Sequence, residues 1–157
     1  MNVPDALLWG FVATVALTSL LEFSRAAGLS RMSLPYVLGT MFTPDRRKAP
    51  LIGAGVHFIN GFIFAFGYAL AFESIGRASW WIGGALGAVH TAFVLAVIAY
   101  LPGIHPRMAT EQDGPRATRA LQPPGFLGLN YGVQTPAVAL AAHLVYGAVL
   151  GALYTVQ

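Results

Sequence analysis

Four long, nearly uncharged runs constrain the fold of this chain more than any other feature. They cover about residues 6–24, 51–72, 80–101 and 136–156, and each approaches the roughly 20 apolar residues with which a helix crosses a bilayer. Only 10% of the residues are charged and the mean hydropathy is +0.64, whereas a soluble domain has about 25% charged residues. The sequence therefore predicts an all-α membrane protein, with residues 1–157 forming a single transmembrane domain folded as a four-helix transmembrane bundle.

The distribution of basic residues predicts how the spans are oriented. Five of the nine Lys and Arg residues lie between the first and second spans and three between the third and fourth, whereas Arg77 is alone in the short turn between the second and third. By the positive-inside rule, the two long connections are cytoplasmic and both termini lie outside. The expected partners are the lipid bilayer and other membrane subunits or a second copy. No nucleic acid is expected, because no aromatic-interleaved basic motif accompanies the charge.

Small residues recur at four-residue steps within the spans, so on a helix they line one narrow face. Membrane helices use such faces to bring their backbones into close contact. The glycines predicted to pack helices together are Gly53, Gly61, Gly83, Gly87, Gly147 and Gly151. Pro136 is expected in the first turn of the last helix, with Thr135 as its N-cap.

Each span also carries one imidazole or carboxylate group: Glu22, His57, His90 and His143. At 1.5 Å per residue, His57 and His143 lie about 9 and 10 Å from the cytoplasmic side, and His90 about 16 Å. Glu22 lies within about 5 Å of the same side by the same measure. Ionisable groups at such depth are costly and usually face a partner or a cavity.

These groups permit several kinds of chemistry. His57 and His143, at matched depth on different helices, are candidates for binding a cofactor such as haem b. The set His57, His90, His143 and Glu22 could bind a transition metal through imidazole and carboxylate, because the chain has no cysteine to supply thiolate. The same groups could instead pass protons. Each histidine could also simply hydrogen-bond a neighbouring helix, as isolated histidines in membrane spans commonly do.

No catalytic motif is present: there is no Walker loop, no His-Glu-x-x-His and no Gly-x-Ser-x-Gly. His105, just beyond the third span, is expected to contact a headgroup or anchor a loop. The small size and the absence of catalytic motifs favour a non-enzymatic accessory subunit that packs in a larger membrane assembly or oligomer. The alternatives are a haem- or metal-binding redox or assembly protein, and a small transporter or proton path.

Two segments carry a resemblance to a known group of proteins. They are the last-span pattern His143-x-x-Tyr146-Gly147-x-x-x-Gly151 and the second-span stretch Gly55–Gly61, which contains His57. Together they resemble small bacterial four-span membrane proteins of unassigned function. The resemblance implies a multi-pass protein of the bacterial inner (plasma) membrane and implies no activity.

Overall fold

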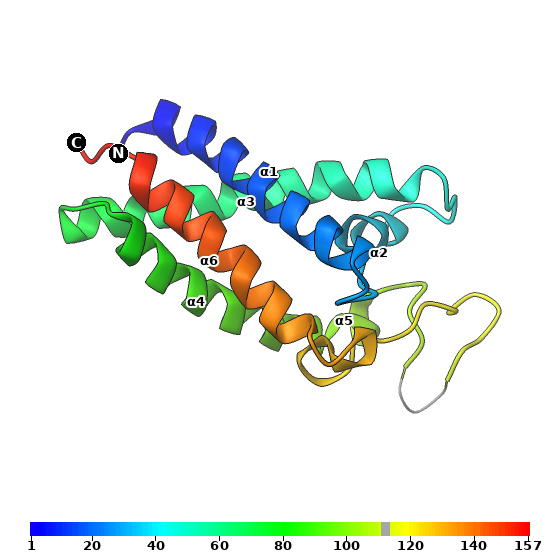
Figure 1. The fold of residues 1–157 in the computed structure, drawn as a ribbon. Coiled ribbons are helices and arrows are strands. Elements are labelled where there is room, and N and C mark those ends of the chain that lie inside the picture. The colour runs from blue at the N-terminus through cyan, green and yellow to red at the C-terminus, as the bar shows by residue number, and fades with distance from the viewer. Residues whose placement is uncertain (111–113) are drawn as a thin grey trace.

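Four long helices dominate the computed structural model, which describes residues 1–110 and 114–157 (Figure 1). They are α1 (Val3–Ala26), α3 (Ala49–Ile75), α4 (Trp80–Ile98) and α6 (Thr135–Leu153). Three short elements, α2 (Leu34–Thr40), α5 (Leu101–Ile104) and the 3₁₀ helix η1 (Phe126–Tyr131), lie in the connections. Each long helix is long and apolar enough to cross a membrane. The prediction of a helical chain with four such helices is confirmed for the described residues.

Proline and glycine mark where several helices begin and end. Proline occupies the first turn of α2, α3 and α6, where its missing N–H is not needed for helical hydrogen bonding. α3 ends at Gly76, whose φ of +70° is the left-handed conformation that a residue without Cβ adopts at low cost. The predicted N-cap of α6 is wrong by one residue. Gln134 is the cap, and the Thr135 hydroxyl instead hydrogen-bonds the Ser30 hydroxyl at 2.9 Å.

The long helices do not all contact one another equally. α6 packs between α1 and α4, α1 also packs against α3, and α2 covers part of α3. Both termini and the turn between α3 and α4 lie at one end of the molecule, and the two long connections lie at the other (Figure 1). At the first end, Tyr154 donates a hydrogen bond to Glu73 at 2.6 Å and accepts one from the Asn2 backbone N–H at 2.8 Å.

The helices meet where glycine allows their backbones to touch. A Cβ on Gly83 would meet the backbone of Gly147, and a Cβ on Gly87 would meet the backbone of His143. A Cβ on Gly61 of α3 would meet the Thr14 side chain of α1. Such contacts replace the hydrophobic drive that helices lack in lipid with close van der Waals packing.

α4 ends at Ile98, three residues before the end predicted for the third span, and the chain turns into α5 and reaches His105. The His105 side chain is completely buried. Its Nε2 lies 3.0 Å from the Val37 carbonyl of α2, and its Nδ1 accepts a hydrogen bond from the Arg107 backbone N–H at 3.1 Å. Because a carbonyl can only accept, Nε2 carries the proton and the ring is neutral. His105 thus anchors the chain after α5 to the C-terminal half of α2.

This anchor is expected to weaken in acid. Burial lowers the pKa of His105 below its usual value, and the nearby Arg107 and Arg119 cations lower it further. When the chain around His105 opens, its imidazole takes up a proton near pH 6.5, whereas the buried imidazole of the folded chain resists protonation. The stability that neutral, buried His105 contributes is therefore complete above pH 6.5, and it is lost as the pH falls from 6.5 through the pKa of His105 in the folded chain. We expect limited proteolysis within residues 105–110 and 114–121 to be faster at pH 5 than at pH 7.5.

His105→Gln is the matched control, because its amide can donate to Val37 but does not titrate. It should be cleaved faster than the wild type at pH 7.5 and show little further change at pH 5. Equal cleavage of the wild type at both pH values, after correction for protease activity on an unfolded substrate, would contradict this role of His105.

Candidate functional site

A cavity of about 280 Å³ lies among the long helices and is lined by three of the four His and Glu side chains predicted to lie within the spans. All four long helices contribute to its walls, and α2 contributes two leucines. Its lining is mainly apolar. The polar or hydroxyl-bearing side chains in the lining are Thr14, His57, Asn60, His90, Thr135, His143 and Tyr146. The cavity thus brings together the three histidines of the spans.

His143 on α6 presents a defined hydrogen-bonding group to this cavity. The ring is buried, and its Nδ1 lies 2.7 Å from the Ala139 carbonyl one turn earlier. Since the carbonyl can only accept, Nδ1 carries the proton, and in the neutral ring Nε2 keeps its lone pair. His143 can therefore accept a hydrogen bond from a bound molecule or donate its lone pair to a metal ion.

His90 on α4 is the imidazole that contacts His143. The two ring centroids are 4.5 Å apart in an edge-to-face arrangement. The other side of His90 stacks on Phe64 of α3 at 3.8 Å, and its Nδ1 is 3.4 Å from the Tyr68 hydroxyl. His90 is thus held between α3 and α6 by aromatic contacts and one long hydrogen bond.

His57 on α3 lines the same cavity but lacks a partner. Its Nε2 is buried and makes no hydrogen bond to any described residue. A buried polar atom without a partner costs about 1–3 kcal/mol, and native proteins seldom retain one without a reason. Of the histidines, His57 is therefore the one that most clearly calls for a further hydrogen-bonding partner.

Glu22 is not placed with the histidines. Its carboxylate accepts a hydrogen bond from Arg25 at 2.8 Å, one turn later on α1, and a longer one from the Ser33 hydroxyl at 3.5 Å. Glu22 does not line the cavity. The arginine near the end of α1 supplies a charged partner at the surface, so the carboxylate has no need to turn toward the interior.

The sequence does not predict that aromatic side chains surround the histidines, although Tyr146 belongs to the last-span pattern named above. Tyr146 donates a hydrogen bond to the Gly61 carbonyl at 2.5 Å, which ties α6 to α3. Phe64 and Tyr68 follow His57 by seven and eleven residues, and this helical spacing puts them on its face of α3. The spacing could have identified them, but only with the knowledge that this face points inward.

The described residues contain no group of three or more His, Cys, Asp or Glu side chains arranged to hold a metal ion. The reasons are local: Glu22 is held by Arg25, and Nδ1 of His143 is engaged by the Ala139 carbonyl. Protein metal sites of this kind normally use three or four such ligands. The structure places His57, His90 and His143 around one cavity and Glu22 outside it, and metal binding by this set stays a prediction.

Comparison with known proteins yields no family: no family model, no curated protein and no solved structure matches this chain. The resemblance to small bacterial four-span proteins stays a prediction. The histidine-lined cavity is therefore the feature of this chain that bears most directly on its function.

Proposed function

We propose that this chain is a small, non-enzymatic membrane protein that binds a small molecule in the histidine-lined cavity. In this proposal the four long helices form a transmembrane bundle of the bacterial inner membrane. Eight of the nine Lys and Arg residues belong to the two long connections, so the end that carries them is cytoplasmic and both termini lie outside.

The observation that carries the binding function is the unpartnered Nε2 of His57 in a cavity shared with His143. Polar groups placed among apolar membrane helices are costly unless they find a partner. Because Nδ1 of His143 is engaged by the Ala139 carbonyl, Nε2 of His143 has a lone pair that can accept a second hydrogen bond from the same molecule. A molecule that supplies hydrogen-bonding partners to these nitrogens would remove the cost of burying them. In an otherwise apolar binding site, a few such polar groups also fix the orientation of the ligand.

Haem and metal binding have less support. A haem clamped between His57 and His143 would need a flat slot beside the His143 ring, and there the His90 ring lies at 4.5 Å. The cavity, at about 280 Å³, is also slightly smaller than the roughly 300–1,000 Å³ of pockets for drug-sized ligands, so it favours a molecule smaller than a haem. Packing in a larger assembly stays a prediction based on the small size of the chain, and it is compatible with a binding role.

The test is to look for a molecule that co-purifies with the protein. We expect wild-type protein, purified in a mild detergent and extracted with organic solvent, to release one small molecule at close to stoichiometric amount in mass spectrometry. His57→Ala and His143→Ala should each retain about tenfold less of it, as expected for the loss of one buried hydrogen bond. Gly84→Ala is the control, because a Cβ at Gly84 meets no atom within 4 Å.

The same samples distinguish the alternatives. A Soret band in the visible spectrum, or a stoichiometric metal lost in His143→Ala, would replace the proposal with haem or metal binding. Protein that contains neither a small molecule, a haem nor a metal would overturn the binding function.

A further inference from the structure

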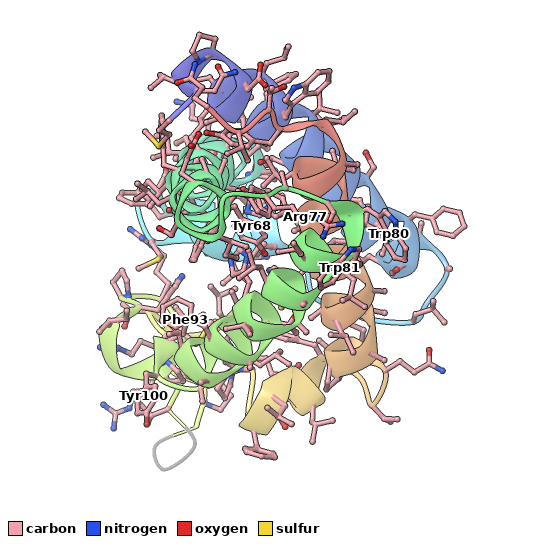
Figure 2. All side chains as sticks on the ribbon, turned by 90° about the vertical axis from the view of Figure 1, so that its left-hand side faces the viewer. Tyr68, Arg77, Trp80, Trp81, Phe93 and Tyr100 are labelled. Atoms are coloured by element: carbon pink, nitrogen blue, oxygen red, sulfur yellow. The ribbon has the colours of Figure 1, made fainter. Side chains whose placement is uncertain are left out.

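Residues of both α3 and α4 line the cavity, but these two helices make few contacts with each other. These helices are neighbours in sequence and are joined by a short turn, yet α4 packs mainly on α6, and α3 packs on α1 and α2. Figure 2 looks along the molecule from the end that holds the termini and the α3–α4 turn, with α3 nearly end-on above α4. The interval between their backbones is bridged by aromatic side chains, with Phe64 stacked on His90 and Phe93 edge-on to Phe64 at 6.0 Å.

Phe93 shows that this flank reaches the outer surface. Its side chain lines the cavity, yet it is 55% exposed. Val97, one turn further along α4, also lines the cavity and is also exposed. Both residues belong to a helix that is long and apolar enough to cross a membrane. The surroundings of this opening in a bilayer are therefore acyl chains and not water.

The lining defines the chemistry of the molecule that would fit. Among the residues that the structure describes, no Lys, Arg, Asp or Glu lines the cavity, so an ionised ligand would be buried without a fixed countercharge from them, at high cost. The apolar walls favour a hydrocarbon body. The Nε2 lone pair of His143 can accept a hydrogen bond from a donor, and the hydroxyl group is the simplest neutral donor.

We propose that the cavity binds a neutral, membrane-soluble molecule with a hydroxyl group, which enters from the lipid between α3 and α4 and donates its hydroxyl proton to Nε2 of His143. This inference rests on the proposed binding function and adds the ligand class and the route. The cavity volume suits one ring or a short branched group, and a longer apolar tail would lie along the opening beside Phe93.

The test of the ligand class uses a matched pair of probes, 4-nonylphenol and its methyl ether 4-nonylanisole. The two have nearly the same shape, but only the phenol has a donor. Binding to the purified full chain in lipid nanodiscs is measured by the rise in unfolding temperature with probe concentration. We expect the phenol to bind about tenfold more tightly than the ether, the ratio typical of one hydrogen bond. In His143→Phe the two affinities should become equal.

The outcomes separate the two proposals. Equal binding of phenol and ether to the wild-type protein would overturn the hydroxyl class whether or not His143→Phe folds. If neither probe binds but wild-type protein still releases a stoichiometric molecule on extraction, the inference fails and the binding function stands. If no probe binds and no molecule is released, both fail.

The route is tested by the rate of association. Phe93→Ala should widen the opening and speed binding of the phenol several-fold, with a smaller effect on affinity. Val89→Ala is the control on the same helix, because Val89 is 68% exposed and does not line the cavity. Association rates that are the same in Phe93→Ala, Val89→Ala and wild type would overturn entry between α3 and α4.

Discussion

Gly83→Ala is expected to separate α4 from α6 and to lower the free energy of unfolding more than any conservative change elsewhere in α4. A Cβ at this position would meet the backbone carbonyl of Gly147, and it would lie 3.0 Å from the backbone nitrogen of Gly151. A flexible side chain could turn away from the new methyl group, but a backbone cannot. Overpacking of this kind costs about 1–3 kcal/mol, and a clash with backbone belongs at the upper end.

Gly83→Ala should also change the shape of the cavity. Gly87 lies one turn further along α4, against the backbone of His143, and His90 follows it by three residues. A helix displaced at Gly83 would therefore carry the His90 ring away from His143. We expect Gly83→Ala to lose the co-purifying molecule as well as stability.

The measurement is unfolding by sodium dodecyl sulfate, followed by circular dichroism in mixed micelles. The matched control is Gly84→Ala, one residue along the same helix, where an added Cβ meets no atom within 4 Å. Alanine is the better helix former by up to about 1 kcal/mol, so this control should be as stable as the wild type or slightly more so. Similar unfolding midpoints for the two variants would show that α4 and α6 do not pack in solution as described.

The long apolar helices could be predicted from the sequence because their signal is local. A run of about 20 uncharged residues satisfies its own backbone hydrogen bonds only as a helix when no water is available. The short helix α2 was not predicted as a helix, since Leu34–Thr40 is too short for periodicity to stand out. Its position comes from contact with α3, which is a tertiary effect.

The histidine cluster was predicted only in part, because depth along a helix says nothing about which helices are neighbours. Matched depth suggested a pair of His57 and His143. In the structure the ring in contact with His143 belongs to His90, and His57 lines the same cavity without a hydrogen-bonding partner for Nε2. The wide interval between α3 and α4 has no sequence signature, because a short turn ordinarily joins helices that pack on each other.

Gly53→Ala is expected to release α2 from α3. A Cβ on Gly53 would meet the Pro35 carbonyl and would lie 2.6 Å from the Gly39 backbone nitrogen. Both of these atoms belong to the backbone of α2, so the short helix must move as a unit. Overpacking of this kind costs about 1–3 kcal/mol. Because amide exchange reports the free energy of local opening, exchange in α2 should become roughly ten- to a hundredfold faster.

The effect should extend from α2 to the chain after α5 and stop there. The last turn of α2 accepts hydrogen bonds from His105 at the Val37 carbonyl and from the Arg107 side chain at the Thr40 carbonyl, 2.6 Å away. Release of α2 removes these acceptors, so protection should fall around His105 while α4 and α6, which pack on each other, keep theirs. Gly55→Ala is the control two residues along α3, where an added Cβ meets no atom within 4 Å. Equal exchange in Gly53→Ala and Gly55→Ala would mean that α2 is not held against α3. Loss of protection throughout α4 and α6 would mean instead that α2 is part of one cooperative unit with the long helices.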